Sequence, residues 1–402
     1  MSGQGLNTYG AATWGQFFIY QGFNQNAGWM HTTSTADTID EFAETVERGT
    51  ESNQWTYRYG KETRPVTVKT VARAYRKPDG TIGRRTFNTY ATDHGPVVRE
   101  ADGKWISAAL MHRPVSALQQ SFLRTKVKDL TGFRRVAKLQ ANSSNNTLFA
   151  SKTGETALFL PQFIPRRDPR FDYTKPVDGS DPATDWQGLH AFRELPQVVS
   201  PANGWAMNVN DGPWWAAGAN SPKQAEYARY FDQVGSRPRT TAALRVLAAQ
   251  PSLTLDQLVE AAHDPWIPMF AQQIPELVAA HARKPNASRA EAVALLAEWD
   301  YRWSLTSTET SLAVFWADAL WERVAATAGI PLASVQPALM VQASAADKLA
   351  ALDAAIAGLK ADFGSWRVPW GEINRFQRID GSIVQTFEDA KPSIPVPFVS
   401  AN

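Results

Sequence analysis

The amino-acid sequence predicts an α+β protein with a large helical insertion, and three observations lead to this class. Residues 14–160 alternate apolar and polar side chains between short turn signals, as antiparallel strands do. Residues 222–365 space their apolar side chains at the helical period. Residues 366–402 return to loop and strand patterns. We therefore expect a β-rich core over 1–221, a helical insertion over 222–365 and a return to the sheet core over 366–402.

Hairpin turns define the strands of the first region. The stretch "RPVTVKTVARAYRKPDGTIGRRTFNTYAT" (64–92) alternates valine with polar residues and turns at "KPDG", a hairpin signal. The next stretch turns at Asp102-Gly103, and residues 147–160 turn at "KTGE". We expect these short turns to join antiparallel strands.

Capping residues indicate where the helices begin and end. Ser252 or Thr254 is the expected cap of "LDQLVEAA", and Ser288 with Glu291 three residues later has the spacing of a capping box. Two further helical stretches, "SLAVFWADALWERVAATAG" and "AADKLAALDAAIAGLKADFG", close near a glycine, which favours the backbone conformation that ends a helix.

Composition excludes several function classes. The 402 residues contain 41 basic and 39 acidic side chains, so the charge balance indicates neither a nucleic-acid partner nor a membrane surface. The absence of cysteine excludes disulfides, thiolate metal sites and a cysteine nucleophile. No apolar run approaches the ~20 residues of a membrane span. We expect the 15 tryptophans to fill cores, with a groove for sugars or aromatic ligands as the alternative.

Two carboxylates in "TADTIDEF" form the first candidate site. Asp37 and Asp40 stand three residues apart, so that together with an intervening carbonyl they could converge on a hard cation such as calcium. The alternative is a solvated face or a helix cap. A glycosidase would instead use Asp37 and Glu41 as an acid/base pair, but nothing in the sequence determines the separation of these two groups.

Two further candidates lie in turns. Asn208, Asn210 and Asp211 precede a Gly-Pro pair, where Asn and Asp ordinarily bond their own backbone. The functional alternative is a side-chain amide that donates to a developing oxyanion. His94 in "TDHGPVV" could act as a base or be structural. No histidines stand at zinc-ligand spacing, and no G-x-S-x-G motif marks a serine nucleophile.

Four stretches together resemble the penicillin acylase family of N-terminal-nucleophile amide hydrolases, in the family's order. They are "GFNQNAGWMHTTSTADTIDEF", "DHGPVV", "DPRFDY…TDWQGLHAFRELPQVVSPANGWAMNVNDGPW" and "GSRPRTTAALRVL". The resemblance covers nearly the whole chain. It implies an αββα sandwich of antiparallel sheets and the hydrolysis of a small-molecule linear acyl amide through an acyl-enzyme.

The resemblance also assigns roles to individual residues. It implies that the backbone N–H of Thr33 and the side chain of Asn210 form the oxyanion hole, and that Arg237 lies at the periphery of the site. One fixed oxyanion donor is worth roughly 3–4 kcal/mol. The family's nucleophile is an N-terminal serine whose own α-amino group, with a pKa near ~8, acts as the base.

Structural calcium is the implied cofactor. The resemblance implies four ligands: the Asp37 carboxylate, the Ile39 carbonyl, the Asp40 carboxylate and the Pro169 carbonyl. A further aspartate is expected near Asn220 or Ser221, and neither residue is acidic.

The resemblance places the nucleophilic serine several dozen residues before the segment that matches Trp29. We therefore expect a β-chain fragment that lacks the nucleophile and its α-chain partner, and we do not assign the role to Ser2. Family members are commonly exported, so the expected location is periplasmic or extracellular, although "MSGQGLNTYG" carries no signal peptide. The alternatives are a catalytically silent remnant or binding protein, and a glycan-binding or glycan-active protein.

Overall fold

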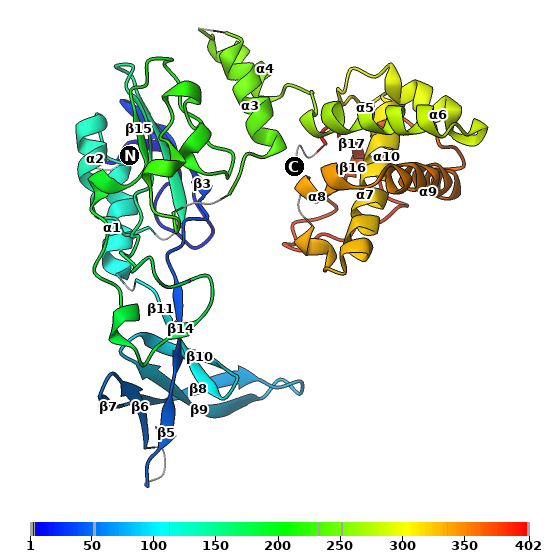
Figure 1. Ribbon diagram of the computed structural model, residues 1–402. Helices are drawn as coiled ribbons and strands as arrows, with labels where there is room; N and C mark the ends of the chain where they lie inside the picture. The colour runs from blue at the N-terminus through cyan, green and yellow to red at the C-terminus, as the bar shows by residue number, and fades with distance from the viewer. Residues whose placement is uncertain are drawn as a thin grey trace. The chain divides into compact units, whose positions relative to one another are not determined.

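A computed structural model describes residues 3, 5–50, 54–111, 113–142, 144–231, 234–250, 252–335 and 337–399. Ser2 lies outside the described residues. The chain divides into two compact units, Met1–Gly235 and Ser236–Asn402 (Figure 1). The first unit is built mainly from strands and the second mainly from helices, which confirms the predicted α+β class.

Two six-stranded sheets form the frame of the first unit. The first sheet is antiparallel throughout and has the order β1 (Thr8–Ala11), β2 (Gln21–Asn24), β3 (Ala27–Thr33), β12 (Asn145–Ser151), β13 (Thr156–Phe159) and β15 (Gln197–Val199). The second has the order β14 (Val177–Asp178), β4 (Asp40–Glu44), β11 (Lys104–Ala109), β10 (Gly95–Ala101), β9 (Ile82–Thr92) and β8 (Thr67–Arg76). The short segment between β3 and β4 connects the two sheets, and it contains Asp37.

Minor elements complete this unit. A three-stranded sheet contains β5 (Val46–Arg48), β6 (Trp55–Tyr59) and β7 (Glu62–Pro65). Single 3-10 turns occur at η1 (Pro182–Thr184), η2 (Phe192–Glu194), η3 (Pro213–Trp215), η4 (Gly218–Asn220) and η5 (Gln224–Glu226).

The predicted hairpin turns are confirmed. Lys77 N–H donates to the Thr81 carbonyl at 2.8 Å and closes the "KPDG" turn between β8 and β9. Asp102 and Gly103 both adopt positive φ, 51° and 70°, between β10 and β11. This left-handed conformation explains why an Asp-Gly pair stands there.

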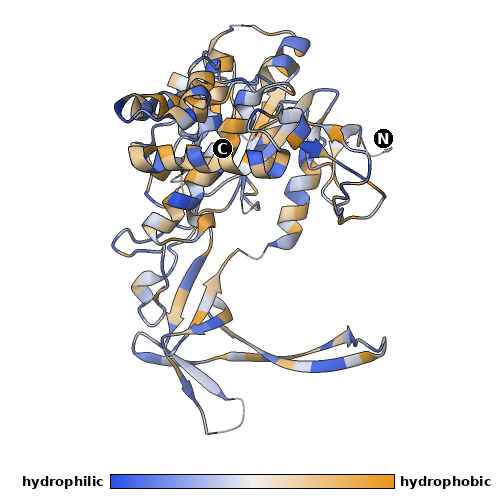
Figure 2. Cartoon of the chain, turned by 90° about the vertical axis from the view of Figure 1, so that its right-hand side faces the viewer, coloured by the Kyte–Doolittle hydropathy of each residue, from blue (hydrophilic) through white to orange (hydrophobic). Residues whose placement is uncertain are grey.

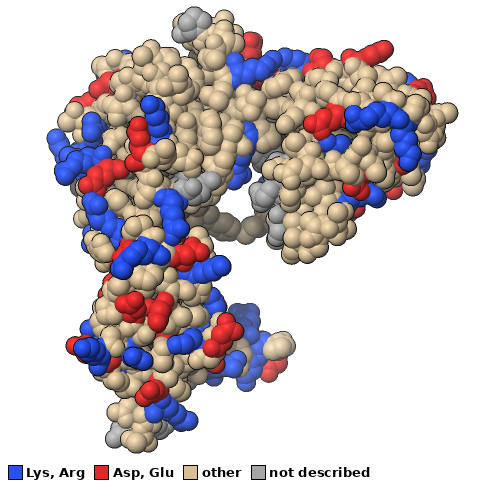
Figure 3. All heavy atoms as spheres, viewed as in Figure 1, with Lys and Arg blue, Asp and Glu red and all other residues tan. Residues whose placement is uncertain are grey.

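Hairpin β8–β9 extends away from the rest of its sheet, with hydrophilic and hydrophobic residues mixed along both strands (Figure 2). Its basic side chains are Lys69, Arg73, Arg76, Lys77, Arg84 and Arg85. Elsewhere, basic and acidic side chains are interspersed on the face shown in Figure 3, as their near-equal numbers predict.

The region that we expected to be largely strands is so, and it also contains two helices that the sequence did not predict. They are α1 (Pro114–Arg124) and α2 (Leu130–Ala137). Pro114 stands at the start of α1, where a missing N–H costs nothing. Asp129 caps α2 by accepting a hydrogen bond from Gly132 N–H at 2.7 Å. These signals are local and fall between stretches with a clear strand pattern.

The core of the first unit lies against the sheet that contains β3. Phe133 of α2 contacts Phe149 and Phe159 of that sheet, with ring centroids 4.6 and 6.1 Å apart. Ala157, Leu158 and Phe159 are all 0% exposed, so this stretch of β13 is buried on both faces. Burial of these aromatic and aliphatic side chains holds β3 in place.

The second unit contains eight helices among its described residues. They are α3 (Pro238–Ala248), α4 (Leu255–Ala262), α5 (Pro268–Arg283), α6 (Ala287–Ala297), α7 (Thr308–Ala328), α8 (Pro337–Gln342), α9 (Ala345–Phe363) and α10 (Trp370–Ile373), with one 3-10 turn at η6 (Leu332–Ser334). Its core is formed by α5, α6, α7 and α9 around Trp316, which is 1% exposed.

Three predicted helix ends are confirmed and one is wrong. Thr254 caps α4, and Gly329 and Gly364 end α7 and α9 with φ of 64° and 75°. The predicted Ser288 cap is wrong, because Asn286 caps α6 and accepts hydrogen bonds from both the N–H and the hydroxyl of Ser288. Both residue types are good caps, and the backbone path decides between them.

The last described segment forms a small sheet of its own, and its return to the sheet core stays a prediction. Its strands, β16 (Arg375–Phe376) and β17 (Ile394–Pro395), pair with each other. Asn374 fixes this small sheet by donating to the carbonyls of Val396 and Phe398 at 2.8 and 2.9 Å. None of the helices in the described part of the chain combines the length and apolar character that a membrane crossing requires.

Candidate active site and acidic shelf

The structure brings Thr33 and Asn210 together, although 177 positions separate them in the chain. Thr33 is the last residue of β3 and is exposed. Asn210 lies in the loop after β15, and its side-chain Nδ2 donates to the Thr33 carbonyl at 3.3 Å. Asn210 has φ of 66°, a left-handed conformation that asparagine tolerates better than most residues. Both residues predicted for the oxyanion hole therefore lie at one place.

A buried neighbour, Asn208, determines the shape of this loop. Its Oδ1 accepts hydrogen bonds from Thr32 Oγ1, Asn146 Nδ2 and Asn210 N–H at 2.5, 3.1 and 2.9 Å. Its Nδ2 donates to the carbonyl and the carboxylate of Asp211 at 2.9 and 3.2 Å. Asn208 thus ties the loop to β3 and β12 at once. Sequence reasoning treated it as a turn residue, and the Asn-x-Asn-Asp pattern was the available signal.

Arg237 belongs to the second compact unit, where it lies just before the first helix. It is the cap residue of α3, where its N–H donates to Thr240 Oγ1 at 3.0 Å. It also lines a cavity of about 580 Å³ together with Trp266, Met269 and Gln273. Its role at the periphery of the oxyanion site stays a prediction.

The four residues predicted to bind calcium, Asp37, Ile39, Asp40 and Pro169, are called the acidic shelf below. Asp40 is only 1% exposed, so the alternative of a solvated face does not hold for this residue. Its Oδ2 accepts hydrogen bonds from Arg167 Nε at 2.7 Å and from Trp186 Nε1 at 2.5 Å. Arg167 also reaches Asp37, because its Nη2 donates to the Asp37 carbonyl at 3.1 Å and lies 3.5 Å from Asp37 Oδ1.

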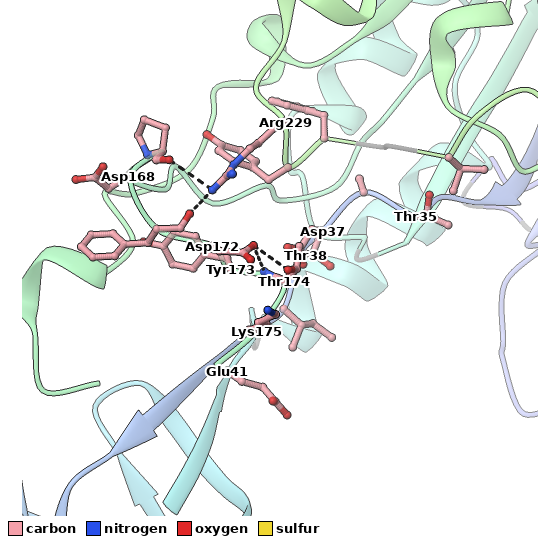
Figure 4. Close-up of a pocket in the computed structure, with 17 residues that line it drawn as sticks. Thr35, Asp37, Thr38, Glu41, Asp168, Asp172, Tyr173, Thr174, Lys175 and Arg229 are labelled. Carbon is pink, nitrogen blue, oxygen red and sulfur yellow. Dashed lines mark hydrogen bonds between the residues drawn. The ribbon is translucent and has the colours of Figure 1, made fainter. Parts of the chain in front are cut away.

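A second arginine contacts the other side of the shelf. Arg229 Nη2 donates to the Pro169 carbonyl at 3.4 Å and also to the Phe171 carbonyl. Figure 4 shows these two bonds at the rim of a cavity of about 750 Å³, into which Asp37 and Thr38 also face. Burial raises the pKa of Asp37 above its ordinary value, and the nearby Arg167 only partly opposes this effect.

The shelf fits a calcium ion poorly. Arginine side chains contact three of the four predicted ligand residues. A divalent ion about 5 Å from a guanidinium is repelled by roughly 7 kcal/mol at an effective dielectric constant of about 20. Within the described ranges, no group of three or more His, Asp or Glu side chains could hold a metal. Calcium binding stays a prediction.

Two buried atoms at the shelf have no hydrogen-bond partner, Asp40 Oδ1 and Arg167 Nη1. One is an acceptor and the other a donor. A neutral ligand such as water can serve both kinds of group, whereas a metal ion serves only the acceptor. The unsatisfied pair therefore gives no specific support for a cation.

His94 lies in a different cluster and is held between two carboxylates. Its Nδ1 is 2.8 Å from Glu44 Oε1, its Nε2 is 3.0 Å from Asp185 Oδ1, and its ring stacks on Phe42 at 4.0 Å. Burial lowers the pKa of His94, but the hydrogen bonds to Glu44 and Asp185 outweigh burial and raise the pKa above its ordinary value. This arrangement favours the structural alternative for His94, because both ring nitrogens are already engaged.

The tryptophans mostly serve the cores, as expected. Trp29, Trp214, Trp299, Trp316 and Trp370 are all less than 9% exposed. Trp14, at 82%, is the one tryptophan among the strongly exposed large apolar residues of the described ranges. The other tryptophans of the described ranges are half-buried, and most of these pack against the cores.

Comparisons with known proteins agree with this fold. The structure is similar to a thermostable penicillin G acylase from Alcaligenes faecalis, with a TM-score of 0.69 and 19% identity, over 92% of this chain and 74% of that one. This likeness shows an α+β fold of the penicillin acylase type. The family model for penicillin amidase matches residues 1–393, and the chain belongs to that family.

Curated relatives are distant in sequence. Penicillin G acylase of Escherichia coli is 24% identical over 266 residues, which cover 64% of this chain and 29% of that protein. Acyl-homoserine lactone acylase PvdQ of a Pseudomonas fluorescens strain is 23% identical over 335 residues, which cover 75% and 42%. The chain thus spans less than half the length of the curated relatives that it matches.

Proposed function

We propose that this chain supplies the oxyanion-binding half of an amidase that removes an acyl group from an amine. The observation that carries the proposal is the hydrogen bond from Asn210 to Thr33. It joins two residues to which the family resemblance had independently assigned one function. Membership of the penicillin amidase family supports the same reaction class.

The geometry suits the stabilisation of a tetrahedral oxyanion. Asn210 is oriented by its bond to the Thr33 carbonyl, and its side-chain amide is the kind of donor that stabilises a developing oxyanion. The hydrogen bonds of Asn208 position the loop before substrate arrives. Donors that are fixed in advance stabilise the developing charge without reorganisation in the reaction itself.

The attacking group in this proposal is an N-terminal serine that uses its own α-amine as base. Its oxygen attacks the substrate carbonyl, the negative charge develops on the carbonyl oxygen at Asn210, and the amine leaves with a proton. Water then releases the acyl group by the same route in reverse. The serine, the α-chain partner and a periplasmic or extracellular location are supported by the family resemblance.

Hydrolysis of chromogenic acyl amides tests the proposal. Two preparations are compared: the 402-residue chain, and the product of the gene with any in-frame sequence that precedes Met1. We expect release of the chromophore by the second preparation after processing. Processed protein without turnover on aromatic, aliphatic and dicarboxylic acyl amides would contradict the proposal and favour a silent binding protein. Specific binding on a glycan array would favour the glycan alternative.

A further inference from the structure

We propose that the Arg167 guanidinium is the built-in cation of the acidic shelf, so that the shelf needs no metal ion. This inference goes beyond the proposed function, because it concerns how the segment after Thr33 is held. It replaces the predicted calcium ion with a side chain of the chain itself.

The first argument is the depth and geometry of the contact. The side chains of Arg167 and Asp40 are both 0% exposed, and Arg167 Nε donates to Asp40 Oδ2 at 2.7 Å. The same guanidinium bonds the Asp37 carbonyl and lies 3.5 Å from the Asp37 carboxylate. The Arg167 guanidinium therefore bridges both aspartates, which is the role that was predicted for calcium.

The second argument is that aromatic rings fix the guanidinium in place. Arg167 Cζ lies 4.9 Å from the ring centroid of Tyr230 and 5.6 Å from that of Tyr173. Tyr173 is itself anchored by a hydrogen bond from its hydroxyl to the Thr184 carbonyl at 2.9 Å. Tyr230 is anchored by His190, at 2.7 Å. Arginine is suited to such a place because its planar group bonds along its edge and stacks on its faces.

The third argument concerns the Pro169 carbonyl, the fourth predicted calcium ligand. Calcium would need the Pro169 carbonyl, and Arg229 already donates to it. Two arginines from different parts of the chain thus place positive charge against the carboxylate and carbonyl oxygens of the acidic shelf. Arg167 lies in the segment between β13 and β14, so its bonds tie that segment to the connection between the two sheets, four residues after Thr33.

Thermal unfolding with and without calcium tests the proposal on the full chain. The melting temperature is measured after dialysis against EGTA and again in about 5 mM CaCl₂, and calcium is titrated into the EGTA-treated protein by calorimetry. We expect no binding heat and a shift in melting temperature below about 1 °C, since a ligand that does not bind the folded state cannot stabilise it.

Substitution of Arg167 gives the reciprocal result. Arg167→Ala leaves two acidic groups without their cation, so we expect the melting temperature to fall by on the order of 10 °C. Part of this loss should be recovered in CaCl₂, because the space between the carboxylates is then open to a metal. Arg170→Ala is the matched control: its side chain is 71% exposed in the same segment, and we expect neither effect.

Saturable calcium binding by the unsubstituted chain, with a higher melting temperature in CaCl₂ than in EGTA, would overturn the proposal. An unchanged melting temperature in Arg167→Ala would overturn it as well. If Arg167→Ala does not fold, the calcium titration of the unsubstituted chain decides the question by itself.

Discussion

Replacement of Asn208 by alanine tests whether this residue holds the oxyanion loop. The change removes the acceptor of three hydrogen bonds and the donor of two. Two of the groups that lose a hydrogen bond, on Asn146 and Asp211, belong to residues that are only 1% exposed. Asn146 Nδ2 keeps a bond of 3.4 Å to the Thr33 carbonyl. An intramolecular hydrogen bond contributes about 0.5–1.5 kcal/mol net, so we expect the loss of these five bonds to cost roughly 2.5–7.5 kcal/mol in the free energy of unfolding.

Thermal and urea unfolding measure this loss. For a unit of this size the melting temperature should fall by on the order of 10 °C. Asn203→Ala is the control, because Asn203 makes one hydrogen bond, from its Nδ2 to the Ala217 carbonyl at 2.9 Å. We expect that variant to lose only about 1 kcal/mol. If Asn208→Ala were no less stable than Asn203→Ala, the account of the loop would be refuted.

Two further predictions concern charged clusters in the first unit. The raised pKa of His94 means that its imidazolium stabilises the fold fully below the unfolded value of about 6.5, and that this contribution is lost as pH rises through the higher folded-state pKa. Urea midpoints should therefore fall with pH above about 6.5, and His94→Gln should weaken this dependence; an equally steep dependence in the variant would contradict the assignment. Asp40→Asn breaks a buried ion pair and should cost roughly 3–5 kcal/mol in urea unfolding, against almost nothing for Asp79→Asn at the exposed hairpin tip. Equal midpoints for these two variants would show that the pair with Arg167 does not stabilise the fold.

Local signals in the sequence predicted much of the fold. Turns such as "KPDG" and the glycines at 329 and 364 require particular backbone conformations, so their residue types indicate them directly. Helices α1 and α2 were missed because they are short and lie between strongly alternating strands. The choice of Asn286 over Ser288 as a cap depends on the backbone path, which residue type alone does not determine.

The site depended on contacts that no spacing reveals. Thr33 and Asn210 could be associated only through the family resemblance, because a separation of 177 positions leaves no periodic signal. The arginines of "PRRDPR" also show that sequence alone does not reveal which residue is buried at a site. Arg166, Arg167 and Arg170 look alike in sequence, yet their side chains are 41%, 0% and 71% exposed. Tertiary packing selects the one that becomes the buried cation.

The turnover number of Asn210→Ala tests the central claim most directly. It is measured on a chromogenic acyl amide with the processed protein, beside Asn220→Ala, which removes an exposed asparagine at the end of η4. Loss of one oxyanion donor should lower kcat by roughly 100- to 1,000-fold. We expect KM to change little, and Asn220→Ala to match the unsubstituted protein. A kcat for Asn210→Ala close to that of Asn220→Ala would contradict the assignment of Asn210 to the oxyanion hole.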